Sequence, residues 1–167
     1  MLEDFNQFIN DSNNKNFFSY IKMFHPESIF VILDSDFARL NIVRKYSGRI
    51  PIFSTSIERE SYGLICKIDQ SEEILSPKDF VRKYTKPLFI MGIGLYGQLF
   101  IKDVRIFEKL KMAEEHTNYH SPIIIFGSPR EEKLATIHGL FDLYINNTDP
   151  SAFLKLDYVI SNVVISN

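Results

Sequence analysis

The chain has 167 residues, 45% of them hydrophobic and 24% charged, which suits one compact globular domain with a substantial core. Its formal net charge of −2 excludes bulk attraction to nucleic acid, so RNA or DNA binding would need a local basic patch. A single cysteine, Cys66, excludes an intramolecular disulfide and a zinc site built from several cysteines.

The sequence predicts neither a membrane-spanning helix nor a signal peptide. No apolar run approaches the ~20 residues that a membrane-spanning helix needs. The first residues include Glu3 and Asp4 and do not form the basic segment and apolar segment of a signal peptide. We therefore expect a cytoplasmic protein with no membrane partner.

The first half of the chain predicts two short helices and then strands. Apolar residues recur at helical spacing on both sides of the polar cluster 10–14. The run at 29–33 is wholly apolar and too short for a helix, which predicts a buried strand, and Asp34 or Asp36 can cap a helix after it. The elements predicted here are two helices within 2–24, a strand at 29–33, a helix at 37–46 and strands at 50–53 and 62–68, the last a candidate edge strand.

The second half repeats strand, loop and helix. Ser76 and Pro77 are typical of a helix start, and the runs at 87–91, 122–126 and 143–145 predict buried strands. An amphipathic helix is expected over 101–116, another after Pro129, and a closing helix after Pro150. This alternation predicts an α/β domain, a mostly parallel sheet with helices on both faces, over 27–167, preceded by a helical extension at 1–26.

Two of these strands end in small, turn-forming residues about twenty positions apart. Gly127, Ser128 and Pro129 follow one strand, and the polar run 146–150 follows the next. Ligands of open α/β sheets bind at the carboxyl ends of parallel strands, because helix N-termini and backbone N–H groups meet there. The sequence therefore predicts two ligand-facing loops near the C-terminus.

A glycine-rich loop, Gly92-Ile-Gly94-Leu-Tyr-Gly97, follows the strand at 87–91 and has the G-x-G-x-x-G spacing of a dinucleotide site. Two observations count against that interpretation. The next strand begins some twenty-five residues later, and it ends in Gly127 and Ser128 with no acid for a ribose. The alternative interpretation is that these glycines only allow the chain to turn.

Metal chemistry has weak support. Asp34 and Asp36, placed after a strand, could hold Mg²⁺ as in haloacid-dehalogenase-like phosphatases, but helix capping explains them as well. The histidines are scattered, and only His116 and His120 have the spacing of a helical zinc pair, near a predicted helix end. We expect no metal.

Phe126-Gly-Ser-Pro129 and Asn147-Thr-Asp-Pro150, followed by a closing helix, resemble the last two loops of the SPOUT (α/β-knot) RNA methyltransferases, in particular the archaeal-type branch. The resemblance covers residues 87–167. It implies a C-terminal trefoil knot, in which the chain after the last strand threads through an earlier loop. It also implies S-adenosylmethionine held in a bent pose by three loops, largely through backbone groups.

The same resemblance implies the site residues. The stretch 34–48 is similar to the first motif of the family, with Asn41, Arg44 and Gly48 as candidates, and Arg44 is the expected catalytic residue, orienting an RNA phosphate or helping to activate the acceptor. A solvated helix face is the alternative for that stretch. The residues expected to bind the cofactor are Gly92, Gly94, Phe126, Gly127, Ser128, Asn147, Thr148 and Pro150.

Two kinds of partner are expected. RNA would meet local basic clusters, one with Arg39, Arg44, Lys45 and Arg49 and one with Arg82, Lys83 and Lys86. The family usually works as a homodimer that buries its C-terminal helix, and here Phe153, Leu156, Val159, Ile160 and Val163 would form that surface. The competing hypothesis is a non-catalytic binding module, knotted or Rossmann-like, that dimerises and binds RNA or protein without a cofactor.

Overall fold

The computed structural model describes residues 2–24, 28–33, 45, 52–58, 61–68, 71–84, 86–92 and 101–164. The strands are β1 Ser28–Leu33, β2 Ile52–Glu58, β3 Ser61–Ile68, β4 Ser71–Leu75, β5 Pro87–Gly92, β6 Ile123–Gly127 and β7 Leu143–Asn146. The helices are α1 Leu2–Asn10, α2 Ser12–Phe24, α5 Pro77–Lys83, α6 Ile101–Ala113, the 3₁₀ turn η1 Glu114–His116, α7 Pro129–Ile137, α8 Ala152–Tyr158 and the π-helical turn η2 Val159–Val164.

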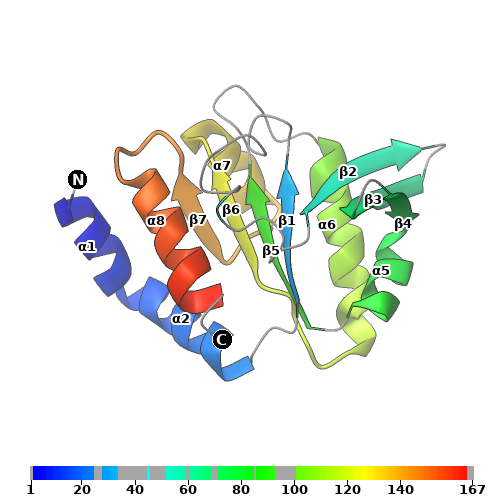
Figure 1. Ribbon diagram of the computed structural model, residues 1–167, viewed down its shortest axis with the longest axis horizontal. Coiled ribbons are helices and arrows are strands. Elements are labelled where there is room, and N and C mark those ends of the chain that lie inside the picture. The colour runs from blue at the N-terminus through cyan, green and yellow to red at the C-terminus, as the bar shows by residue number, and fades with distance from the viewer. Residues whose placement is uncertain are drawn as a thin grey trace.

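All seven strands form one sheet in the order β4-β3-β2-β1-β5-β6-β7 (Figure 1). The pairs β2–β1, β1–β5, β5–β6 and β6–β7 are parallel, whereas β3 and β4 extend the sheet beyond β2 as antiparallel strands. Every residue of β5 and β6 is buried, as expected for parallel strands covered on both faces. The predicted α/β class is confirmed.

Alternate residues of β5 and β6 point into two separate cores, because side chains of a strand alternate between its faces. Leu88 and Ile90 face α2 and α8, and Phe89 and Met91 face the other side. The first core contains Phe18, Ile21, Leu88, Ile90, Ile124, Phe126, Leu143, Ile145, Ala152, Leu156, Val159 and Ile160. The second, under α5, α6 and α7, contains Leu75, Phe80, Phe89, Met91, Val104, Ile106, Phe107, Leu110, Ile123, Ile125, Ala135 and Leu140.

Local sequence explains where several helices begin. Ser76 caps α5 by accepting a hydrogen bond from the Asp79 backbone N–H at 3.1 Å, and Pro77 takes the first helical position, where a missing N–H costs nothing. Ser128 and Pro129 repeat this arrangement at α7. At the other end of α7, Gly139 turns the chain with φ +58, a conformation that glycine adopts without strain.

The structure differs from the sequence prediction at the antiparallel side of the sheet. β4 was not expected, because Ser-Glu-Glu-Ile-Leu shows only two apolar residues, and its position makes β4, rather than β3, the edge strand. β2 extends to Glu58, past the predicted end at 53, since it pairs with β3 over six residues. Of the helix predicted at 37–46, only Lys45 is described, and it is helical.

The predicted knot stays a prediction. β5 pairs with β1, β6 pairs with β5, and β7 pairs with β6. A chain can form this strand order without passing through one of its own loops. The loop at 93–100 lies outside the described residues, so the course of the chain there does not test the knot.

The two N-terminal helices belong to the core rather than standing apart from it. Phe18 and Ile21 of α2 are buried in the same core as α8, and the Phe18 ring lies 5.6 Å from that of Tyr158 in an edge-on contact. Phe5 of α1 contacts the same Tyr158 at 5.9 Å. Of the predicted extension at 1–26, the described residues 2–24 therefore cover one face of the sheet.

Ile21→Ala should lower the free energy of unfolding by about 2–5 kcal/mol, since it removes a fully buried side chain and leaves a cavity. Met23→Ala on the same helix, at a side chain that is 69% exposed, should change it by less than about 0.5 kcal/mol. Urea unfolding followed by circular dichroism measures both. Equal, small effects would mean that α2 does not fold with the sheet.

Candidate functional site

The carboxyl ends of β5, β6 and β7 meet at one edge of the sheet, here called the carboxyl edge. Gly92 pairs with Phe126, and Gly127 pairs with Asn146, so the last residues of the three strands stand side by side. All four residues lie where a sheet of this kind binds ligands. The structure thus brings together the ends of three strands that the sequence predicts to carry ligand loops.

The loops after β6 and β7 are fastened to each other. The Asn147 backbone N–H donates to the Gly127 carbonyl at 2.7 Å, and the Tyr144 hydroxyl donates to the Ser128 carbonyl at 2.6 Å. Burial, with Glu131 and Glu132 nearby, raises the pKa of the Tyr144 hydroxyl well above its usual range, so it stays a proton donor. These bonds fix the two carbonyls at the end of β6 before any ligand arrives.

The start of α7 carries its own carboxylate. The Glu131 side chain accepts from the Ser128 backbone N–H at 3.1 Å and from the Ser128 hydroxyl at 3.0 Å, and the Glu131 N–H donates to that hydroxyl at 3.4 Å. Such a capping box satisfies donors that would otherwise bind an anion. A phosphate at this helix start would meet an acid that already occupies its place.

The loop after β7 is also closed locally. Asn146 Oδ1 accepts from the Thr148 N–H at 2.9 Å and from the Thr148 hydroxyl at 2.7 Å, a turn typical of asparagine. Asn147 is buried, whereas Thr148 and Pro150 are exposed. Asn146 and Asp149 are half-buried, so Thr148 and Pro150 are the residues of this loop most open to a ligand.

A buried lysine joins this loop to α1. Lys155 Nζ lies 3.3 Å from an oxygen of Asp149 and 3.1 Å from Asp4 Oδ2, and it sits 5.4 Å from the centre of the Phe8 ring. The Ser151 hydroxyl donates to the same Asp4 oxygen. Two carboxylates around one buried ammonium compensate its loss of hydration, so the pairing holds the β7 loop, α8 and α1 together.

The predicted site residues fall into three groups. Phe126 directs its ring into the core, 5.7 Å from the ring of Phe153, so only its backbone could contact a ligand. Gly94 and Arg44 lie outside the described residues. The other cofactor candidates gather at the carboxyl edge, and they are Gly92, Gly127, Ser128, Asn147, Thr148 and Pro150.

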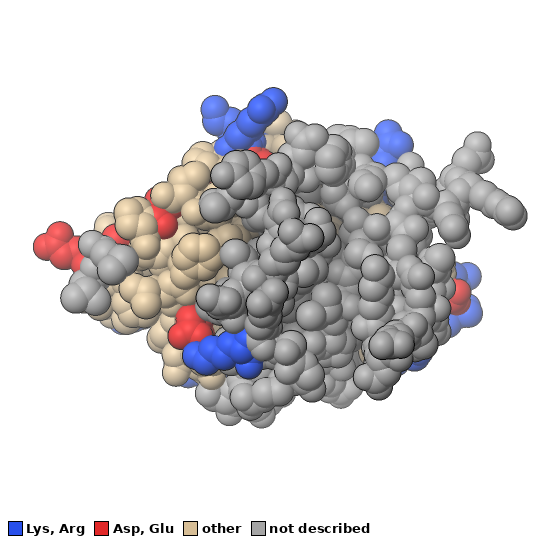
Figure 2. Space-filling model, turned by 45° about the horizontal axis from the view of Figure 1, so that its top comes forward, with Lys and Arg blue, Asp and Glu red and all other residues tan. Residues whose placement is uncertain are grey.

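Lys45 of one basic cluster lies on the opposite face of the sheet from Arg82 and Lys83 of the other. Lys45 Nζ lies 3.2 Å from Asp157 Oδ1 of α8, on one face of the sheet. Arg82 and Lys83 belong to α5 on the opposite face, where Lys83 stands over the Tyr84 ring. Figure 2 accordingly shows the described lysines and arginines in separate small groups.

Among the residues that the structure describes, no three histidine, cysteine, aspartate or glutamate side chains gather as a metal site would need. In the same part of the chain, no helix is both long and apolar enough to cross a membrane.

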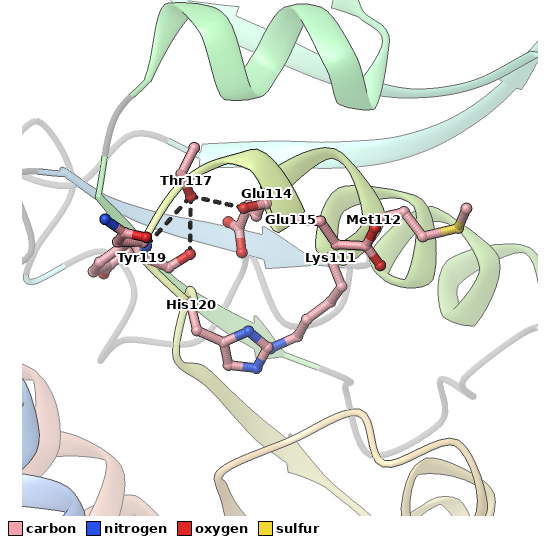
Figure 3. A pocket seen from close by; sticks show the side chains of 8 residues that line it. Lys111, Met112, Glu114, Glu115, Thr117, Tyr119 and His120 are labelled. Carbon is pink, nitrogen blue, oxygen red and sulfur yellow. Dashed lines mark hydrogen bonds between the residues drawn. The ribbon is translucent and has the colours of Figure 1, made fainter.

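A cavity of about 360 Å³ opens at the opposite edge of the sheet, where β6 begins (Figure 3). Its lining comes from the end of α6, from η1 and from the segment leading to β6, and includes Lys111, Met112, Glu114, Glu115, Thr117, Asn118, Tyr119 and His120. Sequence reasoning weighed His120 only as a metal ligand. Its neighbour Lys111 is nine residues away in sequence, a separation at which no motif signals a shared site.

No protein-family model, curated protein or solved structure matches this chain.

Acid should weaken the contact between α1 and the β7 loop. Hydrogen bonds from Ser151 and Lys155 lower the pKa of Asp4 below 3.8, so its stabilising effect is present above that value and is lost as the pH falls through the folded-state pKa. The difference in unfolding free energy between the parent protein and Asp4→Asn should therefore be constant near neutral pH and shrink below pH 3.8. Urea unfolding across that pH range measures it, and a pH-independent difference would contradict the assigned pairing.

Proposed function

We propose that this chain is a SPOUT-like, S-adenosylmethionine-dependent RNA methyltransferase whose cofactor binds at the carboxyl edge. The observation that carries the proposal is the junction of the two loops, in which the Asn147 N–H binds the Gly127 carbonyl at 2.7 Å. The resemblance on which the proposal draws needs these same two loops, after β6 and β7, to form one surface.

The chemistry of the carboxyl edge suits this cofactor better than a nucleotide. S-adenosylmethionine carries a sulfonium, an ammonium and one carboxylate, and no phosphate. Because its net charge is positive, the Glu131 carboxylate at the start of α7 would not repel it as it would a pyrophosphate. Backbone groups of Gly127 and Ser128 would hold the adenosine part, and the exposed Thr148 hydroxyl can reach a ribose. A carbonyl oxygen has two lone pairs, so the bonds already made at Gly127 and Ser128 leave acceptor capacity.

The protein's task in methyl transfer is mainly positioning. The bound cofactor supplies a methyl group on a leaving group that is already activated. The protein has to hold the acceptor in line with that methyl group and exclude competing water. By the resemblance, Arg44 orients the acceptor through its guanidinium, and no strongly basic side chain is required at the carboxyl edge.

The proposed partners are RNA and a second copy of the chain. Leu156, Val159 and Ile160, which the sequence offers as a dimer surface, are buried in the protein's own core. Phe153 and Leu154 on α8 are 44% and 40% exposed, so they are the apolar side chains of α8 that a partner helix could cover. Dimerisation would also bring basic clusters from two protomers to one RNA.

The non-catalytic binding module is the second candidate. The capping box at Ser128, the turn at Asn146 and the Tyr144 hydrogen bond satisfy polar groups of the loops after β6 and β7 without a ligand. An edge whose polar groups are already satisfied can persist in a protein that has no cofactor. Cofactor binding separates the two candidates.

Isothermal titration should show saturable binding of S-adenosylmethionine and of its demethylated product, and no heat with NAD. Thr148→Trp should weaken that binding by at least about tenfold, because a large side chain on the exposed loop would fill the ligand's space. Thr136→Trp, at an exposed position near the far end of α7, is the matched control and should leave the affinity unchanged.

Each other result has a definite meaning. Absence of heat with all three ligands would sink the methyltransferase proposal and leave the binding module. Heat with NAD alone would return the glycine-rich loop that begins at Gly92 to a dinucleotide role. Equal loss of affinity in both tryptophan variants would show general damage rather than a blocked site.

Methyl transfer is tested with cofactor labelled in its methyl group and total RNA as acceptor. The parent protein should label RNA, and Arg44→Ala should reduce the rate by more than about tenfold while cofactor affinity stays within a factor of two, since Arg44 is expected to act on the acceptor. Arg105→Ala, at an exposed position of α6 outside both basic clusters, is the comparison variant and should leave the rate unchanged. Cofactor binding without RNA labelling would separate a retained pocket from an active enzyme.

A further inference from the structure

The cavity at the start of β6 has a reactive pair of side chains on its wall. Lys111 extends from α6 to His120, and Nζ lies 2.9 Å from Nε2 of the imidazole and 3.0 Å from the Ser121 carbonyl (Figure 3). An amine this close to an imidazole nitrogen can pass a proton to it and take it back. This pair lies at the opposite end of the strands from the proposed cofactor site.

The wall that carries His120 is held in place from several sides. The buried Glu114 carboxylate accepts from the Ser121 N–H at 3.1 Å and from the Ser121 hydroxyl. The Tyr20 hydroxyl of α2 donates to the His120 carbonyl at 3.2 Å, and the Tyr119 hydroxyl donates to the Pro87 carbonyl at 2.9 Å. The imidazole therefore has a fixed backbone, as a positioned acid–base group needs.

The environment shifts the protonation balance of the Lys111 side chain toward the neutral amine. Burial lowers the pKa of Lys111, and the carboxylates of Asp142 and Glu114 oppose that shift only in part. The amine is also half-buried, while Lys109, two residues earlier on the same helix, is exposed. A partly desolvated lysine beside a base is the arrangement by which proteins make an amine nucleophilic.

The charges around the cavity restrict what it can take. Glu114 and Glu115 both line it, so an anionic ligand would be repelled. A volume of about 360 Å³ is at the small end of the range for ligand sites. A small, uncharged electrophile fits this combination of an amine, a base and acidic walls.

We propose that Lys111 binds small uncharged aldehydes in this cavity as a reversible imine, with His120 as its acid–base partner. The amine nitrogen adds to the carbonyl carbon, and the carbonyl oxygen takes up a proton as the carbinolamine forms. The proton that the oxygen takes up comes from the amine nitrogen and is passed on by His120. Protonated His120 then gives a proton to the carbinolamine hydroxyl, which leaves as water, and the imidazole regains a proton from the nitrogen as the imine forms. Water reverses the sequence. The reaction joins one amine and one aldehyde and releases one water, with no oxidant or reductant.

The test treats the 167-residue chain with benzaldehyde near neutral pH, and uses cyanoborohydride to reduce any imine to a stable secondary amine. Peptide mass spectrometry then compares residues of one helix. Lys111 should carry several-fold more adduct than Lys109, although Lys109 is the more exposed. Adduct at Lys111 equal to or below that at Lys109 would overturn the proposal, and this comparison needs no variant.

Two variants then separate chemistry from packing. His120→Asn should lower the labelling rate of Lys111 by at least about tenfold, the low side of what positioned acid–base groups contribute, and should leave Lys109 unchanged. Lys109→Arg should not alter labelling at Lys111. Labelling at Lys111 that persists in His120→Asn would show that the imidazole takes no part, and the assigned pair would be wrong.

Discussion

The two-sided burial of β5 and β6 is the constraint on which the rest of the molecule depends. Every residue of these strands is buried, so both faces of the sheet must be covered by helices. Leu88 and Ile90 need α2 and α8, and Phe89 and Met91 need α5, α6 and α7. The sequence predicts the N-terminal helices to be an extension of the domain. In the structure they are required to close one of the two cores.

The same constraint places the loops. Parallel strands connected by covering helices release all their carboxyl ends at one edge, so the residues after β6 and β7 become neighbours. Their contact is then fixed by short-range chemistry, namely the Asn147–Gly127 hydrogen bond and the Tyr144 hydroxyl on the Ser128 carbonyl. The Lys155 cluster adds α1 to this edge, which makes the proposed cofactor site continuous with the N-terminal cover.

The opposite edge has a different character. There Glu114 and the hydroxyls of Tyr20 and Tyr119 fix the segment that leads into β6, and Lys111 bridges that segment to α6. At the carboxyl edge, the described loops after β6 and β7 satisfy polar groups of one another and offer mainly backbone to a ligand. The edge at the start of β6 presents an amine and an imidazole to an open cavity, so the two proposed activities use different ends of the same strands.

The sequence by itself determined the α/β class, most strands and the helix starts at Ser76 and Ser128, because apolar runs and capping residues act over a few positions. It also indicated which strand ends carry turn residues. It could not reveal β4, because that strand is formed by pairing with β3. It also could not reveal that Leu156, Val159 and Ile160, expected at a dimer surface, are buried in the protein's own core. Tertiary structure alone decided that Lys155 meets Asp4 and that Lys111 meets His120. Such contacts are set by how helices cross a sheet, and no local pattern records that geometry.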